Sequence, residues 1–517
     1  MKAIDLYSGI GGWSLGLHLC GIDVVESFER WQPAVDTLNK NFGTSYKSVD
    51  IRSLNFKSLP EDIDIVVGSP PCTQFSYSNR GGSGNIDEGI IDLYKFFECV
   101  SLLKPKYWAM ENVPRVKKVL MKETKEGGQL SKFSKIINSG FVEIMDMSEF
   151  GTPQKRKRCI ASNANLFLLN SYKVKCMPKS LGQVIDNLSK RRIFDLNYKK
   201  ELPRKEIYDL EIGEDLDILE ERMNKEMKTN HPVYNDMSFP ENLNLPARTI
   251  TATCTRVSRE SLIVKSKKGF RRLSIRERAT IQGFPINYNF FGNSYAQKLK
   301  MIGNAIPPNF SYAIGSAFLE KNLSSFEKLE NLTFETSNKS SPPETNPDIS
   351  GNLVLKRNRS FRFSPSYLRF KSGVRFEFSN KSGEFKYKFF YGDSKNIESI
   401  SLDKKIIFLL KKNFKEDNLK KFFEKNFYSS CHFITKDLQR IWSSSKKSKG
   451  PFKIIDNTET LAMKVCKEVD KLKKGKVEQF LSEILDNSNF NNQKIKENSS
   501  KILSGFIVTS FINELSG

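Results

Sequence analysis

The stretch that decides the fold is Ile63-Asp64-Ile65-Val66-Val67-Gly68-Ser69-Pro70-Pro71-Cys72. Its apolar first half is typical of a buried strand. The two prolines cannot continue a sheet ladder, so the chain is expected to turn there. Cys72 is thereby placed just past the carboxyl end of a strand, where open α/β sheets bind ligands. A thiolate at that place can act as a nucleophile, although the commoner fate of a lone cysteine is a small, inert core position.

Strand-like and helix-like segments alternate around this stretch as far as residue 161. The other expected strands are Ala3–Tyr7, Ile22–Phe28, Tyr107–Met110, Phe141–Met147 and Arg158–Ala161. The expected helices are Trp13–Leu19, Pro33–Asn41, Ile90–Leu103 and Ser131–Ser139. This rhythm predicts an α/β fold with a doubly wound, mostly parallel sheet.

The alternation of strand-like and helix-like segments stops in the polar segment 162–269. Helical periodicity returns in Ser274–Ile281 and Pro308–Phe318. The segment Ser337–Pro347 is rich in Ser, Pro, Asn and Thr, a composition typical of an exposed domain boundary. Beyond it, residues 351–517 are lysine-rich, strand-like at first and helical after Ser401. They predict an additional α+β domain.

The chain has 517 residues and a formal net charge of +24. A basic chain most often binds a polyanion such as nucleic acid, but a lysine-rich surface from a biased composition explains the charge as well. No apolar run is long enough to span a membrane, and the strand-like N-terminus leaves no room for a signal peptide. Eight scattered cysteines without Cys-x-x-Cys pairs predict neither a zinc site nor a disulfide framework, which favours the cytoplasm.

A glycine-rich turn, Ser8-Gly9-Ile10-Gly11-Gly12, separates the first expected strand from the first helix. Glycines there let a ligand approach the backbone closely. Glu29 follows about 20 residues on, where a partner for a ribose hydroxyl is expected. Asp50-Ile51 follows a weaker strand signal. The set fits a nucleoside cofactor such as S-adenosylmethionine, while the simpler interpretation is an ordinary tight turn.

Two further groups of polar residues are candidates for chemistry, and the first of them follows a strand at the same sheet edge as Cys72. Glu111 comes after Tyr107–Met110, where a buried carboxyl can work as an acid or a hydrogen-bond donor. Gln154, Arg156 and Arg158 alternate, so in an extended segment they share one face. Taken singly, Glu111 is more often a surface or capping residue, and the second group a basic surface strip.

At this point the chain resembles the cytosine-C5 DNA methyltransferase family, through six motifs in family order over about residues 1–325. They are Asp5–Gly12 for the cofactor, Gly68–Ser76 with the Pro-Cys pair, Glu111-Asn112-Val113, Gln154–Arg158, Arg271–Pro285 and Gly303–Pro308. The Thr-containing stretch Pro246–Thr251 resembles the end of the family's target-recognition region. The chain departs from the family's usual motifs at two places, which are Arg30-Trp31 after Glu29 and the double proline before Cys72.

The resemblance implies roles for individual residues. Cys72 is expected to attack carbon 6 of cytosine, and Glu111, protonated through burial, to bind the N3 and amino edge. Arg158 is expected at the base's O2, with Arg156 supporting the loop geometry. The expected binding residues for S-adenosylmethionine are Tyr7, Ser8, Gly9, Gly11, Gly12, Glu29, Asp50, Ile51, Asn304 and Ala305. No metal is expected.

The predicted organisation is a catalytic domain over 1–161 and 270–330, a target-recognition region over 162–269, a linker over 331–350 and an accessory domain over 351–517. The glycine-rich loop Gln74–Asp92 is expected to be a lid over the DNA. The target cytosine must leave the duplex to be reached. The family further suggests a monomer in a bacterial restriction–modification system, with a cognate endonuclease acting on the same site.

Alternatives from other classes stay open. An RNA cytosine methyltransferase is disfavoured by the long segment 162–269, and a non-catalytic DNA-binding relative by the intact Cys72, Glu111 and Arg158. A C-terminal nuclease would make the chain bifunctional, but no Asp…Glu-x-Lys cluster is convincing in 351–517. Basic and aromatic residues interleave from Lys356 to Phe370, so this domain is predicted to add non-specific DNA affinity; a protein partner, or none, is the alternative.

Overall fold

The computed structural model describes residues 1–75, 85–229, 237–337, 340–346, 348, 361–363, 375–381, 384–393, 396–401, 450–485 and 493–516. The chain divides into two compact units. Unit 1 comprises Met1–Asn224 and Ser238–Ile349, and unit 2 comprises Lys225–Met237 and Ser350–Gly517. Each unit is described by itself.

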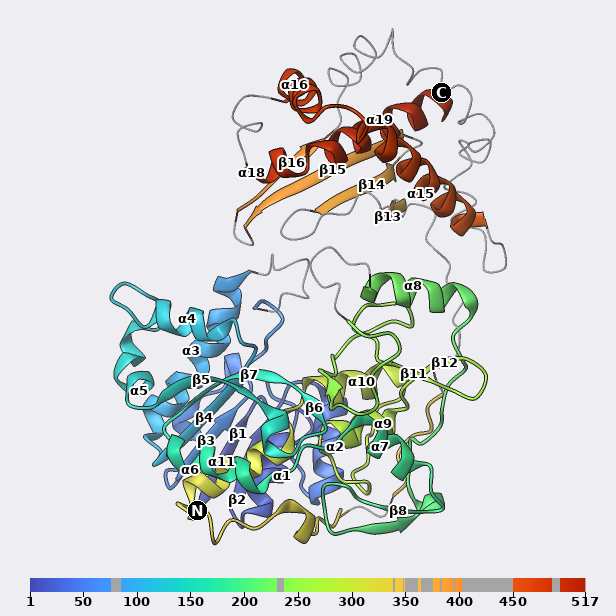
Figure 1. Ribbon diagram of the computed structural model, residues 1–517. Coiled ribbons are helices and arrows are strands. Elements are labelled where there is room, and N and C mark those ends of the chain that lie inside the picture. Colours follow the sequence, from blue (N-terminus) through green and yellow to red (C-terminus); the bar gives the residue numbers. More distant parts are fainter. Residues whose placement is uncertain are drawn as a thin grey trace. The chain divides into compact units, whose positions relative to one another are not determined.

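A six-stranded sheet organises unit 1 (Figure 1), with strand order β2-β1-β3-β4-β7-β5. The strands are β1 (Lys2–Leu6), β2 (Asp23–Phe28), β3 (Ile65–Gly68), β4 (Tyr107–Asn112), β5 (Phe141–Asp146) and β7 (Lys157–Ser162). Only β7 runs against the others in this sheet, since it pairs antiparallel with both β4 and β5. The predicted doubly wound, mostly parallel sheet is confirmed.

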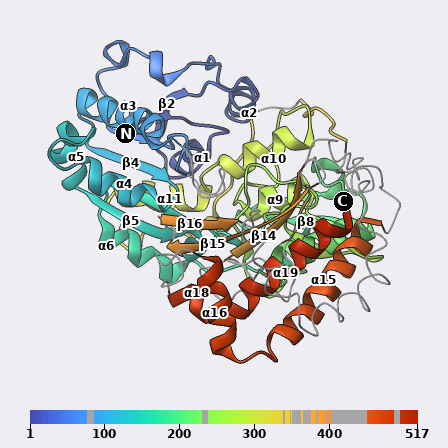
Figure 2. The ribbon, with the colours of Figure 1, turned by 90° about the horizontal axis from the view of Figure 1, so that it is seen from above.

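Helices cover both faces of the sheet because its strands are apolar on both sides. On β3, the fully buried Ile65 and Val67 share one core with α1 (Gly12–Leu19) and α11 (Pro308–Phe318). The intervening Val66 belongs to the opposite core. That core is formed with α3 (Ile86–Leu103), α4 (Val116–Glu123) and α5 (Ser134–Asn138), which lie together in Figure 2.

The segment in which the rhythm failed is built from short elements with a third core of their own. Its helices are α6 (Leu166–Ser171), α7 (Leu181–Leu188) and α8 (Ile218–Thr229). Its short strands are β8 (Arg192–Phe194), β9 (Glu201–Pro203), β10 (Ala247–Arg248), β11 (Ile263–Lys265) and β12 (Phe270–Arg272). The helices α2 (Gln32–Phe42), α9 (Ile275–Ile281) and α10 (Tyr295–Asn304) complete unit 1.

The segment expected as an exposed boundary packs along unit 1 instead. Phe334 is buried in the third core, and the Ser337 amide donates to Asn41 O at 3.0 Å. The buried Lys298 Nζ donates to Pro343 O at 3.0 Å. These contacts, and those of Asp348 described below, hold the described part of residues 326–348 against unit 1. We call this segment the strap.

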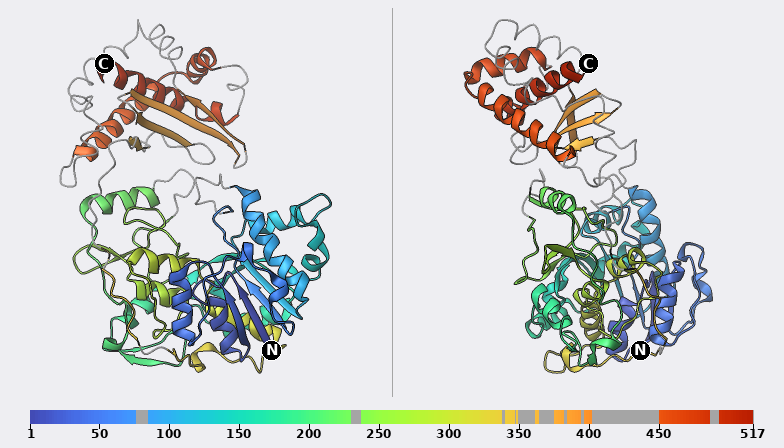
Figure 3. Two further views of the ribbon diagram at one scale, coloured as in Figure 1. Left: turned by 180° about the vertical axis from the view of Figure 1, so that it is seen from behind. Right: turned by 90° about the vertical axis from the view of Figure 1, so that its right-hand side faces the viewer.

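Unit 2 has the expected α+β composition. Its antiparallel sheet has the order β13 (Phe361–Phe363), β14 (Arg375–Lys381), β15 (Glu384–Asp393) and β16 (Asn396–Ser401). Helices α15 (Gly450–Val469), α16 (Lys474–Ile484), α18 (Gln493–Glu497) and α19 (Ser499–Ser516) lie on one side of it (Figure 3). The Tyr387 and Phe506 rings, 5.4 Å apart, join the sheet to α19.

The basic and aromatic stretch from Lys356 to Phe370 lies, except for the backbone of β13, outside the described residues. Its DNA contact stays a prediction. Within the described parts of the chain, no helix combines the length and apolar character needed to cross a membrane.

Candidate active site

A pocket of about 260 Å³ opens at the carboxyl ends of β1, β3 and β4. Strand order reverses between β1 and β3, and ligands of open α/β sheets bind at such a reversal. Twelve of the fourteen predicted site residues line it. They are Tyr7, Ser8, Gly9, Glu29, Asp50, Ile51, Cys72, Glu111, Arg156, Arg158, Asn304 and Ala305.

The two remaining predicted residues, Gly11 and Gly12, are not brought to the pocket. Gly11 begins α1 at φ +84°, a left-handed conformation that favours glycine. A Cβ on Gly12 would lie 2.3 Å from Ile306 O. Both glycines therefore serve close packing. Gly9, by contrast, has φ +54° and open space where a Cβ would be, so the backbone there is accessible from the pocket.

Glu29 closes the glycine turn from the side of β2. Its carboxylate accepts hydrogen bonds from the Gly9 amide at 3.1 Å and the Trp31 amide at 2.8 Å. The strand expected before Asp50 is reduced to an isolated bridge between Glu29 and Ser48. Asp50 instead caps a short 3₁₀ turn by accepting from the Arg52 amide at 3.0 Å.

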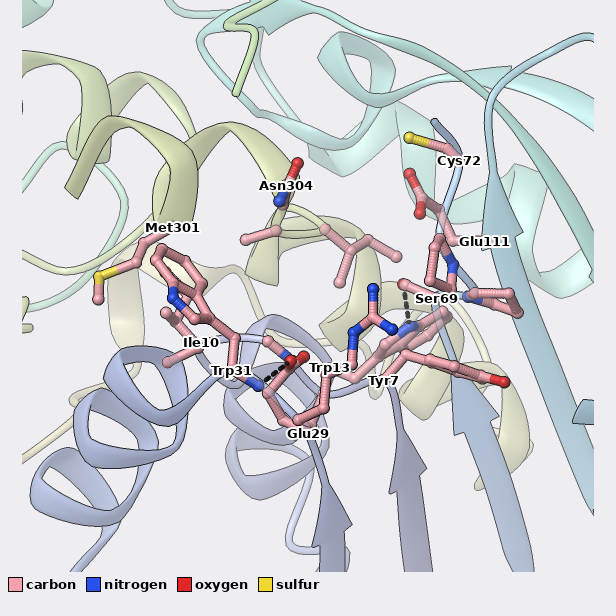
Figure 4. A pocket seen from close by; sticks show the side chains of 18 of the residues that line it. Tyr7, Ile10, Trp13, Glu29, Trp31, Ser69, Cys72, Glu111, Met301 and Asn304 are labelled. Carbon is pink, nitrogen blue, oxygen red and sulfur yellow. Dashed lines mark hydrogen bonds between the residues drawn. The ribbon is translucent and has the colours of Figure 1, made fainter. Parts of the chain in front are cut away.

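Cys72 lies on a loop that is held from two sides. The Asn112 amide group donates to Pro70 O at 2.9 Å, and Trp13 Nε1 donates to Ser69 Oγ at 3.0 Å (Figure 4). Sequence reasoning missed Trp13 and Ser69, although both lie within quoted motifs or beside them. Residues 76–84 of the expected lid Gln74–Asp92 lie outside the described residues. Its last part is not a loop, since Asn85 is the N-cap of α3 and Ile86–Asp92 belong to that helix.

Glu111 lies at the same end of the pocket as Cys72 (Figure 4), and Arg158, which also lines the pocket, lies against Glu111. Arg158 Nε lies 2.9 Å from Glu111 Oε1, and the Glu111 side chain is only 6% exposed. The two groups are close but not aligned as a hydrogen bond, and Glu111 Oε1 has no hydrogen-bond partner in the described structure. An unsatisfied buried acceptor beside a thiol is a site prepared for a polar ligand.

Arg156 has a different environment from Arg158. It is fully buried and donates to three backbone carbonyls, Ile250 O at 3.1 Å, Gly303 O at 3.1 Å and Ala305 O at 3.2 Å. The alternation expected for this segment is observed, since Gln154 and Arg156 are buried while Lys155 and Lys157 are exposed. Arg156 thus joins three segments around the pocket.

Comparison with known proteins agrees with this geometry. The profile of the family described as C-5 cytosine-specific DNA methylase matches residues 1–320, which is more than half of the chain. The chain belongs to this DNA methylase family. It resembles the type II methyltransferase M.HindV of Haemophilus influenzae, with 29% identity over 334 residues, 62% of this chain and 96% of that protein.

Two further similarities cover the same part of this methylase. The type II methyltransferase M.FnuDI of Fusobacterium nucleatum is 25% identical over 346 residues, 64% of this chain and 97% of that protein. A crystal structure described as that of a prophage-encoded DNA modification methyltransferase of E. coli aligns with a TM-score of 0.44 and 21% identity. That alignment covers 62% of this chain and 99% of the other.

The opposite end of the methylase pocket contains residues that the motifs did not single out. Trp31 and Met301 face each other across Ile10 (Figure 4), and Lys300 Nζ lies 4.4 Å from the Trp31 ring centroid. The position of Trp31 two residues after Glu29 could have indicated a role at the cofactor, but it was interpreted only as a departure from the family's motif. Among the described residues, no group of three or more His, Cys, Asp or Glu side chains could hold a metal ion.

Burial sets the acidity of the catalytic candidate Cys72. It raises the pKa of the thiol above its ordinary value, and Arg158 opposes this shift by favouring the thiolate. Glu111 reinforces the rise, whereas Arg156 opposes it. The thiol is therefore mostly protonated at neutral pH in the ligand-free methylase.

The raised pKa of Cys72 predicts how its alkylation depends on pH. Its rate with iodoacetamide is expected to rise about tenfold per pH unit from pH 7 to 9 without levelling off, because only the thiolate reacts. The measurement is the mass-spectrometric label on the Cys72 peptide. Arg158→Gln should slow the reaction at every pH in that range. A plateau below pH 8 would contradict the raised pKa.

Proposed function

We propose that this methylase transfers a methyl group from S-adenosylmethionine to carbon 5 of a cytosine flipped out of duplex DNA. The observation that supports this most is the arrangement of one pocket with two ends. Cys72, Glu111 and Arg158 stand at one end, and Glu29 with the open backbone of Gly9 at the other. The first set suits a cytosine, and the second a nucleoside.

S-adenosylmethionine fits the second end. Its sulfonium supplies the methyl group when it is bound. Glu29 would accept from the ribose hydroxyls, because its carboxylate retains acceptor capacity beyond the two amides. Trp31 and Met301 would flank the adenine ring, and Asn304 and Ala305 lie between the two ends. Tyr7, Ser8, Asp50 and Ile51 complete the proposed binding residues.

Replacement of Glu29 by alanine is expected to weaken S-adenosylmethionine binding by roughly 10- to 100-fold. A lost hydrogen bond to a charged group costs about 1.5–3 kcal/mol, and the Gly9 and Trp31 amides also lose their acceptor. Calorimetric titration gives the cofactor affinity, and a gel shift the DNA affinity, which should change little. An unchanged cofactor affinity would remove Glu29 from the ribose site.

At the first end, Cys72 thiolate would attack carbon 6 and form a carbon–sulfur bond, which moves the ring electrons to carbon 5. Glu111 would hold the N3 and amino edge of the ring, where charge accumulates. Arg158 would donate to O2. After carbon 5 has gained the methyl group, a proton acceptor removes the hydrogen of carbon 5 as a proton. The electron pair restores the 5,6 double bond and expels Cys72 as thiolate.

In this scheme, binding of the cytosine makes the Cys72 thiol more acidic. Its raised pKa means that the free enzyme holds a thiol rather than a reactive thiolate. Pairing of Glu111 with the base would free Arg158 from its close contact with that carboxyl. The cation could then stabilise the developing thiolate.

The biological setting we propose is protection of host DNA in a restriction–modification system. The type II methyltransferases similar to this chain support it. A cognate endonuclease acting on the same sequence would be the functional partner, and the cytoplasm, which contains the DNA, the compartment. We also propose that one chain acts on each target.

Methylation of plasmid DNA tests the function. The purified chain, S-adenosylmethionine and an unmethylated plasmid are incubated, and bisulfite sequencing locates protected cytosines. Protection at one short sequence is expected, and it also identifies that sequence. Methyl transfer to tRNA with none to plasmid would replace the proposal by the RNA alternative.

A further inference from the structure

Asp348, at the end of the strap, lies beyond the residues 1–320 that match the methylase profile. Its carboxylate bridges Arg256 of the recognition region and Arg272, three residues beyond that region. Oδ1 accepts from Arg272 Nη1 at 2.9 Å, and Oδ2 from Arg256 Nη1 at 3.1 Å. Its backbone carbonyl accepts from Arg256 Nη1 and from the Glu214 amide, both at 3.0 Å. Four hydrogen bonds thus fix one acidic residue.

The cluster around Asp348 is buried and balanced in charge. Arg256 also donates to both carboxylate oxygens of Glu220, at 2.8 and 2.9 Å. Side-chain exposure is 1% for Glu220, 8% for Arg256, 4% for Arg272 and 13% for Asp348. Two guanidinium groups face two carboxylates. Loss of the Asp348 charge would leave an excess cation in a buried place, which destabilises such clusters strongly.

Arg256 connects this cluster to the active site through its own loop. The loop begins at Thr251 and Ala252, which lie tightly against Gly303, since a Cβ there would be 2.4 and 2.3 Å from them. Gly303 lines the pocket and accepts a hydrogen bond from Arg156. A shift of the Arg256 loop would therefore displace Gly303 in the pocket wall, because Thr251 and Ala252 are packed closely against it.

We propose that Asp348 is a positioning residue for target recognition, which holds the loop Thr251–Ser261 in its DNA-binding conformation. The proposal rests on the proposed function, in which the region 162–269 contacts the DNA. Asp348 is not among the residues that line the pocket. It acts through Arg256 and Arg272, and it makes the strap, which the methylase profile does not include, part of the recognition apparatus.

The test compares Asp348→Asn with Glu344→Gln in the full chain. Both variants remove one negative charge from the strap, but Glu344 is exposed and makes no hydrogen bond or ion pair with the described residues. The DNA probe is a duplex with the sequence found by bisulfite sequencing, and a second duplex has one base pair of that sequence changed. Asp348→Asn should weaken binding to the first duplex by roughly tenfold or more, since small displacements of binding groups cost up to 10²-fold.

Three further results are expected. Discrimination between the two duplexes should fall in Asp348→Asn, and amide hydrogen exchange should accelerate in residues 251–261. S-adenosylmethionine affinity should fall by less than DNA affinity, because only Gly303 in the pocket wall contacts the start of the displaced loop. Asp348→Glu should restore part of the discrimination. Glu344→Gln should match the unmodified chain throughout.

Two outcomes would overturn the proposal. One is unchanged affinity and discrimination in Asp348→Asn. The other is an equal loss of cofactor and DNA binding, which would indicate a purely structural role. If the unmodified chain itself fails to methylate the plasmid, the proposed function fails first, and this result is independent of Asp348.

Discussion

Replacement of Cys72 by serine is expected to lower kcat for methyl transfer by roughly three orders of magnitude or more, because a hydroxyl is a far weaker nucleophile than a thiolate. The variant should still fold and bind S-adenosylmethionine, since the loop is held by Asn112 and Trp13 rather than by the thiol. Single-turnover transfer of tritiated methyl to plasmid DNA measures the rate.

The matched control for this variant is Cys176→Ser. Cys176 is also half-buried, with a thiol pKa that burial raises to about 11, but it is absent from the pocket lining. Its replacement should leave kcat within about twofold, as expected for a substitution outside the site. A Cys72→Ser rate within tenfold of the unmodified enzyme would remove the thiol from the chemistry.

Replacement of Arg156 by alanine is expected to destabilise unit 1 by about 3–5 kcal/mol, because three buried carbonyls lose a charged donor. Urea unfolding followed by tryptophan fluorescence measures this loss. Trp13, Trp31 and Trp108, three of the four tryptophans, lie in unit 1.

Arg158→Ala gives the contrast, since the two arginines are two residues apart. Arg158 donates to the backbone carbonyl of Lys157, lies 2.9 Å from Glu111 Oε1 and faces the pocket. Its loss should destabilise unit 1 less than the loss of Arg156, because Glu111 also lines the pocket, but it should lower kcat by roughly 100-fold, the scale for one lost donor at a reacting group. Equal effects of the two substitutions on stability would contradict the separate roles.

The parts of the site that sequence reasoning predicted are those fixed by strand ends. Cys72 follows β3, and Glu111 lies one residue before the end of the adjacent strand β4. The two strands pair in parallel, so their carboxyl ends meet. Period two in Gln154–Arg158 predicted which side chains turn inward. These inferences depend on local periodicity and on the rules of parallel sheets, and neither needs knowledge of distant contacts.

What could not be predicted depends on packing between distant segments. Gly11 and Gly12 were expected at the cofactor, but the space they save is filled by Phe42, Tyr288 and Ile306. Helices α7 and α10 were missed, although Ser180 and Ser294 cap them and so gave a helix-start signal in the sequence. The strap has a linker's composition, and its attachment to unit 1 rests on long-range contacts such as the burial of Phe334 and the pairing of Asp348 with two arginines.

The position of the strap matters for any study of unit 2. A truncation after Leu332 would remove Phe334 and Asp348 together with unit 2, so its DNA-binding defect would have two causes. A truncation after residue 349 keeps the strap and removes only unit 2. DNA affinity across a salt series would then isolate the predicted contribution of the basic C-terminal domain.

The most direct measurement uses a duplex with 5-fluorocytosine at the target position and S-adenosylmethionine. Fluorine cannot leave carbon 5 as a cation, so elimination stops after methyl transfer and the enzyme stays attached to the DNA. A denaturing gel should show a shifted band, peptide mapping should place the attachment on Cys72, and Cys72→Ser should show none. A methylated plasmid without any shifted band, or an equal shift with Cys72→Ser, would contradict covalent catalysis by Cys72.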